Sequence, residues 1–394
     1  MGRRMQRELR TVSILCGCLG LVGWALYLAA FSREPSQDWM VFHRAARAAL
    51  DRDFALLLDG DRFTAALNQE FADLLSHPLP LHPWVYPPSF LLLILPFGIL
   101  PFGAAQALFL ALGFAALLAA TNLFARDGVR RALYLGSMLL CPATAITVCL
   151  GQNAFLAAAL LIGGLGIERR RPVLGGILLG LLTFKPQLWI MVPVALVALG
   201  RWRTLAATFG SALGLAAASV CAFGFEPWRE WLVLMSGGNV LYSEWLVAGR
   251  LNGDSIYSCA MLLGASSTLA GLAQTGATLL AAIFVYRAYR RPTNDEMRLA
   301  VLLAATILAA PHTIAYDSVL LAFAATLLFS RGLDGRERPG ETAIALLLWL
   351  SPLINPPSVF RLGLVTPLLI VAFILFAMLA GEPVNARPRS AAAL

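Results

Sequence analysis

The sequence predicts an all-α integral membrane protein, a polytopic bundle of about twelve transmembrane helices. Of its 394 residues, 59% are hydrophobic and only 13% are charged, and the mean hydropathy is +0.74. This composition excludes a soluble globular domain. The apolar residues form long stretches that short arginine-rich loops separate, and this alternation is typical of a chain that crosses a bilayer many times.

The distribution of arginine predicts which loops face the cytoplasm, because cytoplasmic loops are enriched in basic residues. Assigning the N-terminus and the arginine-rich loops to that side places 21 of the 29 arginines there and leaves eight for the other face. We therefore expect a multi-pass protein of the plasma (inner) membrane with both termini in the cytoplasm. The net charge of +8 then reflects topology and predicts no nucleic-acid partner. The assigned loops are 126–131, 168–171, 201–203, 287–298, 331–338 and the C-terminal tail with Arg387 and Arg389.

The spans follow from these loops in chain order. The run from Val12 to Phe31 follows four arginines, but it is too long for a signal-peptide core and lacks a small-residue cleavage site, so we expect an uncleaved first span. The predicted spans are 11–31, 103–125, 131–150, 153–168, 172–184, 187–200, 203–223, 267–289, 297–311, 313–330, 341–354 and 362–380.

Two apolar regions have an uncertain membrane path. The stretch 89–100 lies between proline pairs and is too short for a straight span, so we expect a re-entrant or interfacial segment. The spans 172–184 and 187–200 meet at Lys185-Pro186 and could form a hairpin that does not fully cross. Either path places Lys185 toward the extracytoplasmic side.

Two hydrophilic outer loops are predicted, residues 32–88 and residues 224–266. In the first loop the spacing of Phe42, Ala45, Ala46, Ala49 and Leu50 predicts an amphipathic helix on the membrane surface, and the stretch 63–75 predicts another. The sequence shows no internal repeat and no low-complexity linker, so residues 1–394 are expected to form a single domain.

Lys185 is the only lysine of the chain, and it lies inside the apolar block 173–200. A cation at membrane depth is costly unless it is paired, hydrated or able to extend to the interface. Two interpretations stay open from sequence: Lys185 binds an anion, or its side chain snorkels from a helix end.

Under this topology a set of polar side chains collects on the extracytoplasmic face. Such a set could support transfer from a lipid-phosphate donor, with a carboxylate as base and cations at the leaving phosphate. Its members are Asp38, Gln152, Asn153, Lys185, Gln187, His312, Tyr316 and Asp317.

Each member also has a structural interpretation. Asp38 could be one of several loop acids or a helix cap, Asn153 could cap the following span, and Gln152 could satisfy backbone groups at the turn. His312 and Tyr316 are four residues apart and would share a helix face, with Asp317 in a first turn.

Other candidate features have simpler explanations. Asp59-Gly60-Asp61 resembles a metal-binding motif, but a turn is favoured, and no metal site is expected. The aromatic residues of the outer loops fit an interfacial belt, with stacking on a sugar or prenyl chain as the alternative. They are Trp84, Tyr86, Trp228, Trp231, Tyr242 and Trp245. The cysteines are expected to be small core residues. They are Cys16, Cys18, Cys141, Cys149, Cys221 and Cys259.

At these residues the chain resembles glycosyltransferase family 87, the polyprenol-phosphate-mannose-dependent mannosyltransferases of the GT-C superfamily. The resemblance rests on several short stretches that follow one another in the expected order. They are Asp38-Trp39 with Phe42-His43-Arg44-Ala45-Ala46, Tyr86-Pro87-Pro88-Ser89-Phe90, Gly151-Gln152-Asn153, Lys185-Pro186-Gln187 and Pro311-His312 with Tyr316-Asp317.

The resemblance implies a GT-C-type helix bundle that transfers mannose from a polyprenyl-phosphate donor to a glycolipid or glycan acceptor, with inversion and without a metal or other cofactor. It implies that Asp38 is the general base, that His312 assists near the donor phosphate, and that Lys185 contacts that phosphate. The remaining substrate-binding residues would be Tyr86, Gln152, Asn153, Gln187, Tyr316 and Asp317. Partners are then the donor, the acceptor and membrane lipids, and a monomer is expected.

Two other functions remain possible from sequence. A transporter or flippase for a lipid-linked sugar could bind the same phosphate without chemistry. A related enzyme could use a different polyprenyl-phosphate sugar, such as a pentose or glucose.

Overall fold

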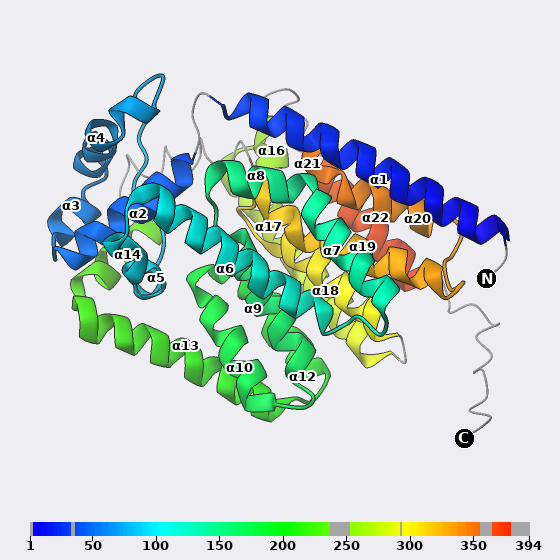
Figure 1. Ribbon diagram of the computed structural model, residues 1–394. Helices are drawn as coiled ribbons and strands as arrows, with labels where there is room; N and C mark the ends of the chain where they lie inside the picture. Colours follow the sequence, from blue (N-terminus) through cyan, green and yellow to red (C-terminus); the bar gives the residue numbers. More distant parts are fainter. Residues whose placement is uncertain (1–2, 33–35, 237–252, 292–293, 355–364, 380–394) are drawn as a thin grey trace.

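The computed structural model describes residues 3–32, 36–236, 253–291, 294–354 and 365–379, and within these residues the regular structure is entirely helical (Figure 1). Every apolar stretch predicted as a span contains a helix or a broken pair of helices. The positions of the predicted helices are therefore confirmed.

Fewer helices than the predicted twelve spans are each long enough to cross a membrane alone. Among the described residues four are long and apolar enough: α6 (Phe102–Asn122), α13 (Trp202–Phe223), α17 (Ser267–Arg290) and the continuous pair η4–α19 (Ala315–Leu333). A fifth candidate is the pair α7 (Gly128–Leu140) and α8 (Pro142–Leu150), bent by 50°. The protein is thus a helical membrane protein with shorter apolar helices between the long ones.

The centre of the bundle is formed by α18 (Asp295–Ala309) and α19 (Val319–Leu333), whose residues are almost all buried. The helices around them show the opposite pattern, with large apolar side chains that protein atoms leave exposed. Leu112 on α6, Leu213 on α13 and Leu279 on α17 are each more than half exposed. Such apolar outer faces are expected where helices meet lipid.

The first hydrophilic loop and the apolar stretch 89–100 that follows it fold into a compact set of short helices, which we call the cap (residues 36–99). Figure 1 shows it at the end of the bundle opposite the N-terminus. The cap helices are α2 (Gln37–Leu50), α3 (Phe54–Leu58), α4 (Gly60–Glu70), η1 (Ala72–Leu74), α5 (Pro88–Ile94) and η2 (Leu95–Ile99).

Both stretches of this loop that were predicted to form amphipathic helices are helical, and their place on the membrane surface stays a prediction. In α2 the residues Phe42, Ala45, Ala46 and Ala49 are buried, whereas Leu50, at the end of the helix, is exposed. The stretch 63–75 folds as the end of α4 followed by η1. Asp59 accepts a hydrogen bond from the Arg62 backbone N–H at 3.1 Å and caps α4, which begins at Gly60, so Asp59-Gly60-Asp61 forms a helix N-terminus and the expectation of a turn is wrong.

The remaining helices complete the bundle. α1 (Arg3–Ala30) precedes the cap in the chain. Between the cap and α13 lie α9 (Ala154–Ile167), α10 (Pro172–Leu181), η3 (Leu182–Phe184), α11 (Pro186–Trp189) and α12 (Met191–Ala198). After them come α14 (Glu226–Met235), α16 (Ile256–Leu262), α20 (Glu341–Trp349), α21 (Ser351–Ile354) and α22 (Val365–Leu379). Of the second outer loop, Tyr242 and Trp245 lie outside the described residues.

Three interruptions in the apolar helices bring polar residues into the bundle. A glycine turn at Gly151 separates α8 from α9, the Lys185-Pro186 step separates η3 from α11, and residues 310–314 separate α18 from η4. A break exposes backbone and side-chain polar groups that a continuous helix would hide, which is tolerated in membrane proteins where protein surrounds it. α8 contacts both α2 and η4, and α9 contacts η3, so the three breaks adjoin one another and the cap.

The arginine-rich loops at the other end hold their own ion pairs. Arg331 Nε lies 2.7 Å from Glu341 Oε1, and both side chains are buried. Arg126 pairs with Glu296 at 3.1 Å and Arg130 with Asp334 at 2.6 Å. The last two pairs join loops that are far apart in sequence, so the arginines also hold the bundle together at this end.

Candidate active site at the helix breaks

Lys185 has an intramolecular partner. Its Nζ lies 2.6 Å from Oδ1 of Asp317, and the two side chains are 2% and 3% exposed. The ammonium also lies 4.9 Å from the centroid of the Tyr316 ring, within the range of a cation–π contact. The snorkelling interpretation of Lys185 is therefore wrong, since the side chain points into the protein and pairs with a carboxylate there.

Asp317 is held in place from its own helix end. It occupies the first turn of η4, as the sequence indicated, and its Oδ2 accepts a hydrogen bond from the Ile314 backbone N–H at 3.4 Å. The helix terminus favours a negative charge at this position. The Lys185 end is fixed by apolar packing, because the neighbouring Phe184 ring stacks on Phe90 of α5 with centroids 4.8 Å apart.

Asp38 lies in the first turn of α2, in the electrostatic field of this ion pair. Burial is the largest effect on it and raises the pKa of the Asp38 carboxyl above its usual range. The charge of Asp317 raises the pKa further, whereas a hydrogen bond from Gln152 and the charges of His82 and Lys185 lower it. A carboxylate that is poorly solvated in this way is a better proton acceptor than one in water.

Gln152 orients two parts of the site. Its Oε1 accepts the Asn153 backbone N–H at 2.9 Å, which leaves its amide N–H₂ group to donate to Asp38. The expectation that Gln152 satisfies the turn backbone is thus confirmed. Asn153 stands at the N-terminus of α9 but its side chain makes no capping bond, so the capping interpretation is wrong for the side chain. That side chain is fully buried near the Tyr86 hydroxyl, although none of its atoms meets strict hydrogen-bond geometry.

Gly151 allows the side-chain amides of Gln152 and Asn153 to approach α2. It adopts a φ of +70°, and a Cβ at this position would collide with Cβ of Trp39, the residue that follows Asp38. Trp39 is itself fixed, since it is fully buried and its Nε1 donates to the Phe102 carbonyl at 3.3 Å. The close contact between Gly151 and Trp39 sets the distance between the cap and the helix break.

Tyr86 connects the cap to the same cluster. Its hydroxyl lies within reach of the side-chain amides of Gln152 and Asn153. Burial, followed by the charges of Asp38 and Asp317, raises the pKa of Tyr86, so the phenol stays protonated and can donate a hydrogen bond. Its ring packs edge-on against Phe42 with centroids 5.2 Å apart.

His82 was not predicted. It belongs to the segment that leads to Tyr86, and its charge lowers the pKa of Asp38, so it lies near that carboxylate. Its position is fixed by a hydrogen bond from its backbone N–H to Thr64 Oγ1 at 2.9 Å. Its place four residues before Tyr86 in the first outer loop was the available signal.

Two further predicted site residues lie next to the helix breaks. Gln187 lies in α11, partly exposed, and makes no hydrogen bond to the cluster among the described contacts. His312 lies in the bend before η4, partly exposed. The expectation that His312 and Tyr316 share a helix face is therefore wrong, because the helix begins only at Ala315.

The site thus combines a carboxylate of raised pKa, a buried ion pair, two amides and a neutral phenol. Within the described residues, no three or more His, Cys, Asp or Glu side chains form a group that could hold a metal ion. Acid–base chemistry and the binding of a charged or hydroxylated ligand are the processes that these groups can perform.

The fold and the site define a helical membrane protein with an acid–base cluster at one end of its bundle. The model of glycosyltransferase family 87 matches residues 84–311, more than half of the chain, and the chain belongs to this family of glycosyltransferases. A comparison with curated proteins and one with solved structures gave no match.

The matched segment contains only part of the cluster. Tyr86, Gln152, Asn153 and Lys185 lie inside residues 84–311, whereas Asp38 precedes the segment. His312, Tyr316 and Asp317 follow it. Asp38 precedes the matched segment in the sequence and Asp317 follows it, and the fold brings both carboxylates to residues of that segment.

Proposed function

We propose that this glycosyltransferase transfers mannose from a polyprenyl-phosphate donor to a hydroxyl group of a glycolipid or glycan. The observation that carries the proposal is the Asp38 carboxylate, with its raised pKa, beside the buried pair of Lys185 and Asp317. A base and a cation close together are what a transfer from a phosphate leaving group requires.

In the proposed reaction, Asp38 takes the proton of the acceptor hydroxyl as its oxygen attacks the anomeric carbon of the donor sugar. The bond from that carbon to the phosphate oxygen breaks, and its electron pair stays on the polyprenyl phosphate. Attack from the opposite side inverts the anomeric centre. The proton then passes from Asp38 to solvent.

Lys185 and His312 are proposed to stabilise the leaving phosphate. An ammonium group has three N–H donors, and Asp317 takes one of them, so two remain for phosphate oxygens. Asp317 holds the ammonium in position in the absence of a ligand. His312 belongs to the bend that leads into η4, which places it on the same chain segment as Asp317.

The amides and phenols are proposed to orient the reactants. Gln152 fixes Asp38 through a hydrogen bond, and Asn153 with Tyr86 offers donors and acceptors for sugar hydroxyls. Tyr316 faces the Lys185 ammonium, and Gln187, two residues after Lys185, is proposed to contact the donor.

The proposed setting follows from the arginine distribution. The chain acts in the plasma membrane as a monomeric, single-domain enzyme, with both termini in the cytoplasm and the cap and cluster at the extracytoplasmic face. The donor is a co-substrate, and the transfer is proposed to need no metal or other cofactor, because Lys185 and His312 supply the positive charge.

The decisive experiment is Asp38→Asn in the purified protein, with radiolabelled polyprenyl-phosphate mannose and a panel of glycoside acceptors. Loss of a general base is expected to lower kcat by about 100-fold to 10,000-fold. Asp61→Asn is the matched control, since Asp61 is an exposed acid of the same cap. Near-normal transfer by Asp38→Asn would refute the assignment of the base.

The same assay separates the alternatives. Binding of the labelled donor without transfer to any acceptor would favour a transporter of lipid-linked sugars. Transfer from polyprenyl-phosphate glucose or a pentose, in preference to mannose, would keep the mechanism and change the sugar.

A further inference from the structure

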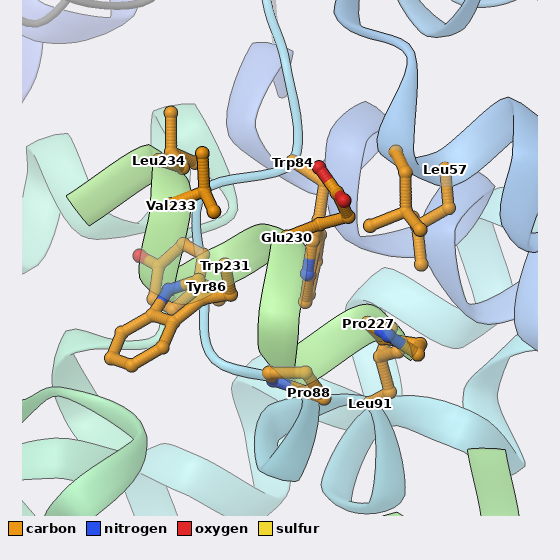
Figure 2. Close-up of a pocket in the computed structure, with 11 residues that line it drawn as sticks. Leu57, Trp84, Tyr86, Pro88, Leu91, Pro227, Glu230, Trp231, Val233 and Leu234 are labelled. Atoms are coloured by element: carbon orange, nitrogen blue, oxygen red, sulfur yellow. The ribbon is translucent and has the colours of Figure 1, made fainter. Parts of the chain in front are cut away.

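An open groove lies between the cap and α14 (Figure 2). About 50 Å³ of it can hold small molecules, the empty space reaches about 520 Å³ when the region open to solvent is included, and its walls come from the two outer loops. Trp84 and Tyr86 line it from the cap, and Pro227 and Trp231 line it from α14. Among the residues that the structure describes, Glu230 is the only charged one in the lining.

The groove is preformed, because hydrogen bonding and ring packing hold its two walls. Trp231 Nε1 donates to the Val85 carbonyl at 3.1 Å, which fastens α14 to the cap segment that contains Trp84 and Tyr86. The buried Trp84 ring stacks on Phe90 with centroids 5.9 Å apart. A site whose walls are already ordered loses little entropy when a ligand binds.

Tyr86 belongs both to this groove and to the polar cluster. Its ring lines the groove, while its hydroxyl interacts with Gln152 and Asn153 and its pKa responds to the charge of Asp38. A ligand that lies along the groove therefore contacts Tyr86, a residue that also belongs to the polar cluster of Asp38.

We propose that this groove binds a sugar ring of the acceptor, an inference that rests on the proposed glycosyl transfer. Indole and phenol rings offer flat apolar faces with polar edges, which suit the mixed surface of a sugar. The Glu230 carboxylate can accept hydrogen bonds from sugar hydroxyls, and a bond to a charged acceptor is stronger than one to a neutral acceptor.

Charge decides between the acceptor and the donor as occupant. The described lining of the groove holds no basic side chain, and its one carboxylate, Glu230, is paired with Arg229, so nothing there attracts the phosphate of a polyprenyl donor, whereas the Lys185 ammonium in the polar cluster can. The groove and the ion pair thus divide the site into a part for a neutral sugar and a part for a phosphate.

The test uses Glu230→Gln with Glu226→Gln as its matched control. Both carboxylates belong to α14 and both pair with Arg229, but only Glu230 lines the groove. With octyl α-mannoside as acceptor, Glu230→Gln is expected to raise the acceptor KM about tenfold, as the loss of a hydrogen bond to a charged group does. The donor KM of Glu230→Gln should stay near the wild-type value. Glu226→Gln should leave the KM of both substrates near the wild-type values.

Trp231→Leu, with Trp228→Leu as control, tests the aromatic wall in the same way. Trp228 lies on the same helix but donates to Ser219 Oγ at 2.8 Å and does not line the groove. A rise in the donor KM instead of the acceptor KM would identify the groove as a prenyl-chain site and overturn the proposal. Unchanged KM values for both substrates would also overturn it.

A binding measurement separates this inference from the proposed reaction. Saturation-transfer NMR with methyl α-mannoside and no donor should show that the ring protons of the sugar contact the protein. Glu230→Gln should weaken this signal. If Asp38→Asn keeps full activity while this binding depends on Glu230, the proposed mechanism fails and the sugar site stands. If transfer depends on Asp38 but neither KM nor binding responds to Glu230, only the sugar site fails.

Discussion

The Lys185 ammonium and the Asp317 carboxylate form an ion pair of 2.6 Å across 132 residues of sequence, with both side chains almost fully buried. The pair joins the η3–α11 break to the first turn of η4. It gives the only lysine of the chain an internal counter-charge, and it places that charge within the electrostatic range of Asp38.

Breaking this pair from one side should destabilise the fold strongly. Lys185→Met or Asp317→Leu leaves one buried charge without a partner, at an expected cost of about 3–5 kcal/mol. The double variant removes both charges and should be more stable than either single variant. Denaturant unfolding in detergent measures the three values. Additive losses in the double variant would show that the two side chains are not energetically coupled.

The same variants separate stability from activity. If the pair also serves the donor phosphate, the double variant should recover stability but not transfer. A double variant with wild-type kcat and KM would mean that the pair is structural only.

The pH dependence of transfer should reflect the raised pKa of Asp38. The base works only when it is ionised, so activity should rise with pH through a pKa above about 4, the ordinary value of an aspartate. Asp317→Asn removes a charge that raises the pKa of Asp38 and should move this limb to lower pH. Lys185→Met removes a charge that lowers the pKa and should move it to higher pH. Shifts of the same sign in both variants would contradict the assignment.

The ionised Asp38 side chain should also lower the free energy of unfolding at neutral pH. An acid whose pKa is raised by folding favours the folded state below its unfolded pKa, and this contribution is lost as the pH rises through the folded pKa. Asp38→Asn should therefore unfold at the same or a higher temperature than the wild type at pH 7. At pH 4 the difference should shrink. A lower melting temperature at pH 7 would show that the carboxylate serves the fold.

Gly151→Ala should disturb the site through the backbone. An alanine with φ near +70° costs about 1–2 kcal/mol, and its Cβ would displace Trp39 and with it Asp38. Lower stability and lower kcat are expected together. Gly210→Ala on α13 is the control, since a Cβ there meets no atom within 4 Å. Equal behaviour of the two variants would contradict the role of the close contact.

The ion pair of Arg331 and Glu341 at the other end of the bundle should affect stability alone. Glu341→Gln is expected to cost about 3–5 kcal/mol because it leaves a buried guanidinium unpaired, without a change in either KM. Glu226→Gln breaks an exposed pair and should change the unfolding free energy by less than about 1 kcal/mol. A change in donor KM with Glu341→Gln would show that the two ends are coupled.

Much of the helix pattern could be predicted from sequence, because hydropathy and arginine position act locally. The helix in the cap that carries Asp38 was also predictable, since its apolar spacing is regular. The partner of Lys185 was not, because nothing local indicates that Asp317 lies beside it. His82 was missed because nothing local distinguishes it from His43 and His77 of the same loop except its place four residues before Tyr86.

The error at His312 has a local cause. A spacing of four residues predicts a shared face only inside a helix, and residues 310–314 interrupt the helix before Ala315. The number of spans stays a prediction, because several apolar helices of the described residues are too short to cross a membrane unless they are joined to a neighbour across a break.

The sequence distance between Lys185 and Asp317 has a consequence for synthesis. During translation Lys185 leaves the ribosome 132 residues before its counter-ion, so its segment must enter the membrane without a partner. A lone cation is costly at membrane depth, so this segment is expected to settle in its final position only after Asp317 has been made. A chain that stopped short of Asp317 would hold Gln152, Asn153 and Lys185 but could not close the site, which makes the formation of this cluster one of the last steps of assembly.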